Sequence, residues 1–328
     1  MLRKLNSRTL SWPTDWADLF GRERPLILEI GFGQGAFLRH LAGQYPDHNI
    51  IGFEVSNRCL VKVEEAIEHH NLSHVRVIHT PAETALHHLF QPATLTQVHI
   101  NFPDPWFKTK HGHRRLMQRD TLDAIVSRLL SGGELYLATD IIEYAEMSHE
   151  LLTGTPGLDN LLDAPWANTM PGRVTTKYER KAHNEGRMCH YFAYRRNDHP
   201  APSVPVMKEL DMPHVVITCP LTLAEIRDAF VQQQQTLDET HISVNMVYES
   251  DRSLLFDVYV KEPTIDQRVA IVLIERDSPQ REYTLQLSML GHPRPTAGIH
   301  RAVNLIKEWL LGLDENSRIL VSKVQSVE

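Results

Sequence analysis

Between residues 26 and 139 the sequence alternates short apolar runs with amphipathic stretches of helical spacing, and this alternation constrains the fold more than any other feature. The runs are L26-I-L-E-I, I50-I-G-F-E, V75-R-V-I, V98-H-I-N-F and E134-L-Y-L-A-T, and helical stretches such as 56–71 and 117–130 separate them. Strands that alternate with helices form βαβ units, which build a mostly parallel sheet. We therefore predict an α/β, Rossmann-like domain whose ligands bind at the carboxyl ends of the strands.

A segment rich in proline and polar residues divides the chain between Arg195 and Pro205, with the sequence R-R-N-D-H-P-A-P-S-V-P. Such composition is typical of linkers, so we predict one domain over 1–197, a linker over 198–206 and a second domain over 207–328. The second domain reads as a smaller α+β domain with an antiparallel sheet, because its central strands are joined by short turns. Its elements are expected at 214–219 (strand), 221–236 (helix), 241–249, 253–262, 267–275 and 281–290 (strands), 296–312 (helix) and 317–322 (strand).

The second domain carries no motif that indicates a chemistry. Its scattered basic residues favour a role in folding, self-association or a protein contact over direct RNA binding, and Q232-Q-Q-Q235 is expected on a helix surface. Its order of elements is similar to that of TATA-binding-protein-like or helix-grip folds, a likeness that predicts no function. The sequence leaves the oligomeric state open between monomer and homodimer.

The net charge of −7 is unevenly distributed along the chain. Residues 1–200 carry 22 Lys+Arg against 23 Asp+Glu, whereas residues 201–328 carry 12 against 18. Local charge decides whether a polyanion binds, so the overall negative charge does not exclude an RNA partner. Residues 106–119 contain no acid and five basic side chains: Lys108, Lys110, Arg114, Arg115 and Arg119.

The sequence predicts a cytoplasmic protein. No apolar run approaches the roughly 20 residues of a membrane span, and the start, M1-L-R-K-L-N-S-R, lacks the apolar core of a secretory signal. Cys59, Cys189 and Cys219 are far apart and form no C-x-x-C pair. They therefore predict neither a disulfide framework nor a thiolate zinc site.

The first apolar run ends in a glycine loop, E29-I-G-F-G-Q-G-A-F37. Gly31, Gly33 and Gly35 allow positive φ and a close approach of the backbone to a ligand. The spacing fits the dinucleotide motif G-x-G-x-x-G only with Ala36 as its third member, so the glycines alone leave a dinucleotide site or a plain turn open. Glu29 discriminates, because a carboxylate here disfavours a pyrophosphate and favours a cation. S-adenosyl-L-methionine, a sulfonium that also carries an ammonium group, is such a ligand.

Two further acids follow predicted strands. Glu54 ends the second strand, where it suits the hydroxyls of a ribose. In N101-F-P-D-P-W106 two prolines fix the backbone around Asp104, which predicts an acid held at the reactive end of the cofactor. The turn is one step removed from the Asn/Asp-Pro-Pro-aromatic turn of amino methyltransferases that act on nucleic-acid bases, and a turn-capping role for Asp104 is the alternative.

The basic run after this turn favours phosphate binding beside the acid. His111 and His113 lie within that run and with Asp104 would provide three ligands for a metal ion. Two histidines among five basic side chains are better explained as part of an anion-binding surface. We therefore predict no metal.

The chain resembles the bacterial tRNA (guanine-N7-)-methyltransferases in five strings and in their order: E29-I-G-F-G-Q-G, G52-F-E-V, F102-P-D-P-W-F-K-T-K-H-G-H-R-R115, A138-T-D140 and T176-K-Y-E179. The agreement runs from about residue 26 to 196, and residues 201–328 resemble no family. The resemblance implies a class I S-adenosylmethionine-dependent methyltransferase fold. It also implies methylation of guanine N7 in tRNA, by convention at position 46 of the variable loop.

The glycine loop, the acids and the resemblance together predict the site. We expect cofactor contacts at Glu29, Gly31, Gly33, Gly35, Glu54, Glu83 and Asn101, a catalytic role for Asp104, and substrate contacts at Lys108, Lys110, Arg114, Arg115, Asp140, Thr176, Lys177, Tyr178 and Glu179. The family usually has an aspartate after the third strand that meets the adenine, but H79-T-P-A-E-T places Pro81 there. That contact is either absent or moved to Glu83. Ile141 stands where the family commonly has tryptophan, and the segment before the first strand is short and less basic than the family's.

The predicted reaction requires no strong general base. Guanine N7 carries a lone pair and no proton, so its attack on a sulfonium methyl depends on orientation and charge stabilisation. Asp104 and Asp140 would stabilise the positive charge that moves onto the base, which has to leave its stack to be reached. Two alternatives stay open: a methyltransferase that acts on another RNA or on a base amino group, and a non-catalytic RNA-binding protein that retains the fold.

Overall fold

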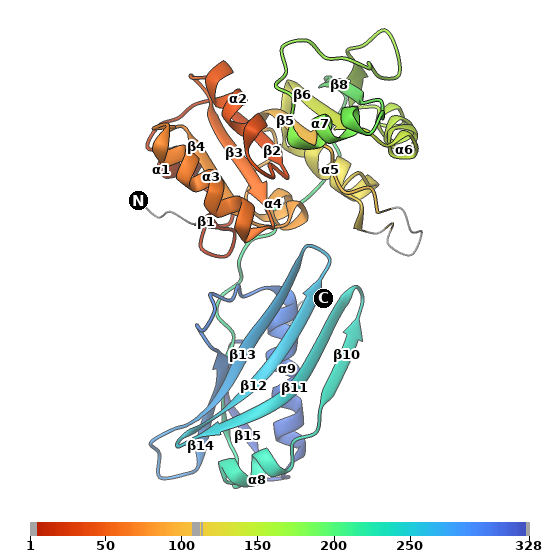
Figure 1. Cartoon of the computed structure of the whole chain (residues 1–328). Helices are drawn as coiled ribbons and strands as arrows, with labels where there is room; N and C mark the ends of the chain where they lie inside the picture. The colour runs from red at the N-terminus through yellow and green to blue at the C-terminus, as the bar shows by residue number, and fades with distance from the viewer. Residues whose placement is uncertain (1–4, 107–111, 113, 326–328) are drawn as a thin grey trace. The chain divides into compact units, whose positions relative to one another are not determined.

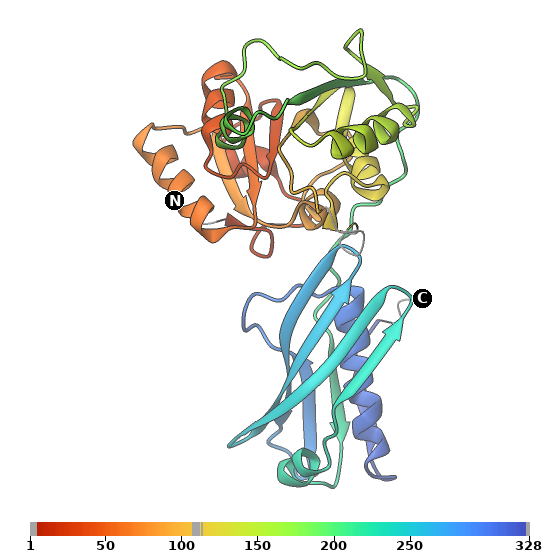
Figure 2. The same cartoon turned by 45° about the vertical axis from the view of Figure 1, so that its right-hand side comes forward.

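The structure is a computed structural model that describes residues 5–106, 112 and 114–325 of the chain. Contacts within the chain divide it into two compact units, Met1–Met207 and Lys208–Glu328, both drawn in Figures 1 and 2. Each unit has its own sheet and its own hydrophobic core. The domain limits drawn from the sequence stay a prediction.

The first unit is built on a mostly parallel sheet (Figure 1). Neighbouring strands from β1 to β6 run parallel, whereas β8 is antiparallel to both β6 and β7. The central strands are buried along nearly their whole length, as expected where helices cover both faces. Within the described residues the spatial order is β1 (Leu5–Asn6), β4 (Val75–His79), β3 (Asn49–Glu54), β2 (Leu26–Ile30), β5 (Leu95–Asn101), β6 (Leu129–Thr139), β8 (His190–Arg196) and β7 (Leu158–Asn160).

The five strands predicted between residues 26 and 139 are present as β2 to β6, and the helices predicted at 56–71 and 117–130 appear as α3 and α5. The alternation of strands and helices confirms the Rossmann-like α/β fold. The helices of this unit are α1 (Trp16–Phe20), α2 (Ala36–Gln44), α3 (Asn57–His69), α4 (Ala82–His88), α5 (Arg119–Arg128), α6 (Ile142–Thr153) and α7 (Lys177–Asn184). None of the helices in the described part of the chain is long and apolar enough to span a membrane.

A buried arginine ends α5 and holds a distant segment. Arg128 is 0% exposed, and its guanidinium donates to the carbonyl oxygens of Leu86 (2.8 Å), Val204 (3.1 Å) and Pro205 (3.2 Å). Burial lowers the pKa of this guanidinium. The last residues of the predicted linker therefore pack against the first unit through their backbone.

The second unit is an antiparallel sheet with a long helix on one face, as Figures 1 and 2 show. Apolar side chains from alternate positions of the strands pack against the helix and form the core. Its elements are β9 (His214–Thr218), α8 (Leu223–Asp228), β10 (Gln233–Leu237), β11 (Thr240–Ser250), β12 (Ser253–Glu262), β13 (Ile265–Glu275), β14 (Glu282–Leu287), α9 (Ala297–Gly312) and β15 (Arg318–Ser322). The predicted α+β domain is confirmed.

The helix predicted over 221–236 is wrong in its second half. Helix α8 ends at Asp228, and Gln233–Leu237 forms β10, an edge strand that pairs antiparallel with β11. After Phe230 and Val231 the sequence offers no apolar residue until Leu237, so a continued helix would have no face to bury against the core. The Q232–Q235 run therefore lies mainly in an exposed edge strand, where polar side chains remain in water.

The interior of the second unit contains polar side chains that the unit itself satisfies. The amide of Gln267, 0% exposed, accepts from the N–H of Arg294 at 2.8 Å and donates to the carbonyl of Arg294 at 3.0 Å. The carboxylate of Glu262 accepts from the hydroxyl of Thr296 and from the N–H of Gly298 (2.8 Å) at the start of α9. Such satisfied groups stabilise a unique packing of helix against sheet.

One imidazole in α9 contacts the two ends of the second unit. His300 is 0% exposed; its Nδ1 accepts from the N–H of Gln325 at 3.0 Å, so its Nε2 carries the proton and donates to the carbonyl of Asp211 at 2.9 Å. Burial lowers the pKa of His300 and favours this neutral form.

Candidate active site

The carboxyl ends of β2, β3 and β5 meet at one edge of the first sheet. β2 lies between the other two strands, and Glu29 is in register with Gly52 of β3 and His99 of β5. Parallel neighbours end at the same edge, which brings together the glycine loop after β2, Glu54 at the end of β3 and the turn after β5. The strand order thus assembles residues that are far apart in the sequence.

The glycine loop has the backbone conformation that its sequence predicts. Gly31, Gly33 and Gly35 have φ values of 75°, 53° and 71°, a region that favours glycine. Gly35 is the N-cap of α2, and a Cβ atom there would lie 2.5 Å from Cγ2 of Val63 in α3. The loop therefore needs glycine for its conformation and, at Gly35, for its packing.

Glu54 holds the glycine loop at the end of β3. Its Oε2 accepts from the N–H of Gly33, and its Oε1 accepts from the N–H groups of Val55 and Ser56, all at 2.9 Å. This carboxylate therefore fixes the loop relative to the start of α3. The predicted contact with a ribose would require it to exchange one of these bonds for a hydroxyl.

Glu29 is a buried acid with one unsatisfied oxygen. The residue is 1% exposed, and its Oε1 accepts from Nδ2 of Asn101 at 3.2 Å. Its Oε2 is buried and has no hydrogen-bond partner in the described part of the structure. Burial raises the pKa of Glu29 to about 8, against the opposing effects of the Asn101 bond and the Arg173 charge. A cation bound beside Glu29 would offset the cost of ionising this buried acid.

A cavity of about 210 Å³ opens beside Glu29. Its walls come from the glycine loop, from Asn101 at the end of β5 and from the beginning of α7. The predicted cofactor residues Glu29, Gly31, Gly33 and Asn101 therefore share one cavity with a predicted substrate segment. The full lining is Glu29, Gly31, Phe32, Gly33, Gln34, Ala36, Phe37, Cys59, Asn101, Thr175, Thr176, Lys177, Tyr178 and Arg180.

The T176-K-Y-E179 segment begins α7 with a capping box. The hydroxyl of Thr176 accepts from the N–H of Glu179 at 3.2 Å, and Oε2 of Glu179 accepts from the N–H of Thr176 at 3.1 Å. Oε1 of Glu179 also accepts from the hydroxyl of Tyr191 at 2.7 Å. These bonds use the side chains of Thr176 and Glu179 within the protein. The exposed side chains of Lys177 and Tyr178 are the ones that face outward for a substrate.

The backbone of the turn that contains Asp104 accepts hydrogen bonds from an arginine side chain. Asp104 is exposed, and the guanidinium of Arg115 donates to the carbonyls of Pro105 (3.1 Å) and Trp106 (3.4 Å). The guanidinium of Arg114 lies 5.1 Å from the centre of a Trp106 ring. Arg115 therefore positions the turn, whereas its predicted contact with substrate stays a prediction. Lys108, Lys110, His111 and His113 lie outside the described residues.

Asp140 follows β6 and is paired with an arginine. Its Oδ2 lies 2.7 Å from the guanidinium of Arg187, which also contacts Glu185 at 2.6 Å. Asp140 therefore presents a charge that is partly neutralised. Within the described residues no group of three or more His, Cys, Asp or Glu side chains could hold a metal ion.

The acid predicted to replace the family's adenine contact lies apart from the cavity. Glu83 is exposed in the first turn of α4, which follows Pro81, and it does not contribute to the cavity lining. Pro81 is the N-cap of that helix and provides no side-chain hydrogen bond. The adenine contact at Glu83 stays a prediction without support from the cavity geometry.

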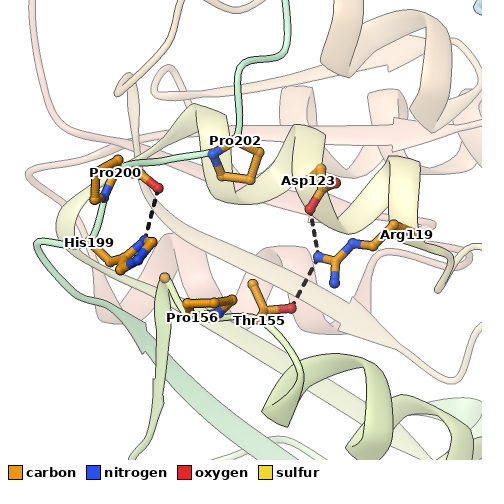
Figure 3. Close-up of a pocket in the computed structure, with 8 residues that line it drawn as sticks. Arg119, Asp123, Thr155, Pro156, His199, Pro200 and Pro202 are labelled. Atoms are coloured by element: carbon orange, nitrogen blue, oxygen red, sulfur yellow. Dashed lines mark hydrogen bonds and ion pairs between the residues drawn. The ribbon is translucent and has the colours of Figure 1, made fainter.

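A second cavity of about 310 Å³ lies in the same unit, beside α5 (Figure 3). Arg119 lines it and donates to Asp123 at 2.6 Å and to the hydroxyl of Thr155 at 3.0 Å. His199 and Pro200 form another part of the wall. Although this cavity is larger, its arginine is already paired and none of the predicted cofactor residues reaches it. The smaller cavity beside Glu29 is the candidate active site.

The first unit matches a known protein family. A family model described as "Putative methyltransferase" matches residues 23–192, more than half of the chain. The chain belongs to this family.

Similar proteins bear out the resemblance drawn from the motifs. A tRNA (guanine-N(7)-)-methyltransferase of Syntrophotalea carbinolica is 35% identical over 59% of this chain and 83% of the relative. One of Thermus thermophilus is 37% identical over 65% of this chain and 67% of the relative. Among solved structures, the 16S rRNA methyltransferase KamB aligns at 13% identity with a TM-score of 0.44, over 59% of this chain and 99% of that one. The predicted family is therefore confirmed for the first unit.

Some residues of the site were missed by sequence reasoning. Phe32 and Gln34 lie inside the glycine loop and could have been included with it. Arg173 donates to Oδ1 of Asn101, yet it stands between β7 and α7 in a segment without a motif. Only the three-dimensional packing reveals it.

Proposed function

We propose that this methyltransferase uses S-adenosyl-L-methionine to methylate N7 of a guanine in tRNA. The observation that carries the proposal is the buried carboxylate of Glu29, whose Oε2 lacks a partner in the described structure and which lines a cavity beside the glycine loop. The names of the similar proteins supply the guanine and the tRNA. A tRNA substrate also implies the cytoplasm as the place of the reaction.

The residues of the cavity fit this cofactor. Glu29 offers an acceptor for an ammonium group, and the positive-φ glycines allow close approach of the backbone. A dinucleotide fits less well, since its pyrophosphate would lie near a buried acid. Glu29, Glu54 and Asn101 would hold the cofactor, which supplies a methyl group on a positively charged sulfur.

The chain's own residues then orient the base and stabilise charge. N7 has a free lone pair, so the site needs no general base. Asp104 is exposed in the turn that Arg115 holds through the Pro105 carbonyl, and its carboxylate would stabilise positive charge on the purine. Lys177 and Tyr178 are exposed at the cavity wall and would contact the substrate, Tyr178 by stacking on an unpaired base. The basic run 108–115 would hold phosphates.

The test is incubation of the protein with isotope-labelled S-adenosyl-L-methionine and unmodified tRNA, followed by mass spectrometry of the nucleosides. We expect 7-methylguanosine, and we expect it to disappear when position 46 of the tRNA is changed from G to A. Label in another nucleoside would overturn the N7 assignment in favour of a different base. Binding of tRNA without any label transfer would favour the non-catalytic alternative.

A further inference from the structure

Arg173 stands in the segment that precedes α7, and its guanidinium lies against two aromatic rings. The guanidinium carbon is 4.5 Å from the ring centre of Phe37 in α2 and 5.3 Å from that of Tyr191 in β8. Stacking of this kind fixes the plane of a guanidinium and with it the direction of its N–H groups. One of these groups donates to Oδ1 of Asn101.

This bond sets the orientation of the Asn101 amide. An amide that accepts on its oxygen must present its NH₂ group on the other side, and that NH₂ donates to Oε1 of Glu29 at 3.2 Å. Without the arginine, the amide could rotate and turn its oxygen toward the carboxylate. Arg173 thereby commits Oε1 to Asn101 and leaves Oε2 of this cavity-lining residue as the acceptor without a partner in the described structure.

The same arginine is connected to the start of α7. The ring of Tyr191 that stacks on Arg173 carries the hydroxyl that donates to Glu179, and Glu179 forms the capping box with Thr176. Thr176 and its neighbours up to Tyr178 line the cavity. One guanidinium thus contacts groups on both walls, the carboxylate side through Asn101 and the α7 side through Tyr191.

We propose that Arg173 is a positioning residue of the cofactor site: it orients Asn101 and supplies the positive charge that keeps Glu29 ready to accept a cation. This inference rests on the proposed function, because it takes the ligand at Glu29 to be the cationic cofactor. Arg173 acts through Asn101 and through its charge, without a hydrogen bond of its own to the carboxylate of Glu29.

The electrostatics around both groups support a charge effect. Burial raises the pKa of Glu29, the nearby charge of Glu54 raises it further, and the charge of Arg173 lowers it. A cation binds to the ionised carboxylate, so affinity for the cofactor should rise with pH until Glu29 is ionised. Removal of Arg173 should move that rise to higher pH. The charges of four nearby groups act on the pKa of Arg173: those of Glu179, Tyr191, Glu29 and Cys189. The charge of Arg173 in turn lowers the pKa of His99.

The test is the dissociation constant of S-adenosyl-L-methionine, measured by calorimetry from pH 6 to 9.5 for the full chain and three variants. In Arg173→Gln we expect the midpoint of the affinity increase to move up by about one pH unit, which weakens binding about tenfold at pH 7. In Arg173→Lys the charge is kept, so the midpoint should stay at the wild-type pH. Its single ammonium cannot both stack and donate, so the affinity should fall by a similar factor at every pH.

Arg39→Gln is the matched control. Arg39 is an exposed arginine of α2, two residues from Phe37, and its loss removes the same unit of positive charge from an exposed position. We expect its affinity and midpoint to equal those of the wild type. An unshifted midpoint in Arg173→Gln, or an equal shift in Arg39→Gln, would overturn the inference, because a merely structural residue weakens binding alike at every pH.

Two further outcomes keep the result decisive. If Arg173→Gln does not fold, Arg173→Lys alone decides. Wild-type affinity in that variant would show that the planar guanidinium is not needed to position Asn101. If the wild-type protein binds no cofactor at any pH, the proposed function fails. Wild-type binding and turnover with an unshifted Arg173→Gln midpoint would contradict only the role of Arg173.

Discussion

The two units each bury a glutamate, and the two carboxylates are satisfied differently. Glu262 in the second unit is 8% exposed and accepts from a hydroxyl and from a backbone N–H at the start of α9. Glu29 in the first unit is 1% exposed, and one of its oxygens has no partner in the part of the chain that the structure describes. Burial raises the pKa of both groups.

The difference separates a structural acid from a ligand-binding one. Glu262 caps a helix that approaches so closely that a Cβ on Gly298 would lie 2.6 Å from Cγ1 of Val260. There the fold itself provides all that the carboxylate needs. At Glu29 the fold leaves a desolvated acceptor beside a cavity, a costly arrangement unless a ligand completes it. Burial and a raised pKa alone would not distinguish these two glutamates; the unsatisfied oxygen does.

The largest expected effect is on cofactor binding by Glu29→Gln. Loss of a buried charge partner should weaken binding of S-adenosyl-L-methionine by a factor between about a hundred and several thousand, in line with the roughly 3–5 kcal/mol lost when a buried ion pair is broken. Calorimetry of this variant and of Glu262→Gln measures the contrast. Equal affinity of the two variants would erase the distinction between the two acids.

A smaller effect is expected for turnover in Asp104→Ala. The exposed acid stabilises charge only as the base is methylated, so turnover should fall by more than roughly tenfold while cofactor affinity stays nearly unchanged. Single-turnover methylation of tRNA and cofactor titration measure the two quantities. Near-wild-type turnover would remove Asp104 from the mechanism.

Glu262→Gln should affect stability and leave catalysis unchanged. An amide cannot accept from both Thr296 and Gly298 as the carboxylate does, so we expect a loss of about 1–3 kcal/mol in the second unit. Hydrogen exchange of the α9 amides reports on that unit alone. Protection equal to the wild type would show that the cap at Glu262 is dispensable.

A further expected effect is a pH dependence of unfolding. Because the folded-state pKa of Glu29, about 8, exceeds its ordinary value of 4.5, the folded protein keeps a proton that the unfolded chain releases between these pH values. Wild-type stability therefore falls as pH rises through this window. The Tm of Glu29→Gln minus that of the wild type should grow from pH 5 to 8.5. Glu23→Gln, an exposed control, should show no such trend.

The sequence predicted the part of the fold that rests on local patterning. Short apolar runs between helical stretches located β2 to β6, because a strand buried on both faces has to be apolar along its length. β10 was missed because its glutamines and threonine carry no strand period, and only pairing with β11 makes it a strand. Edge strands depend on their partner more than on their own residues.

The site could be predicted where a motif carries the chemistry and not where tertiary packing does. The spacing of the glycine loop predicted Glu29, Gly31 and Gly33 as site residues, and these three line the candidate cavity. Arg173 could not be found, because its role depends on Phe37, Asn101 and Tyr191, which lie far from it in the sequence. Glu179 was predicted to contact substrate, yet T-x-x-E before a helix is also the pattern of a capping box, which is how the structure uses it.

The imidazole of His300 has a practical consequence for engineering. It binds the backbone near the beginning of the second unit, at Asp211, and near its end, at Gln325. Because the same imidazole binds both segments, the two ends of this unit lie close enough to be joined or grafted through short connections. The unit is therefore suited to insertion into an exposed loop of an unrelated host protein, and a host that still folds would give a way to study this domain apart from the enzyme that carries it.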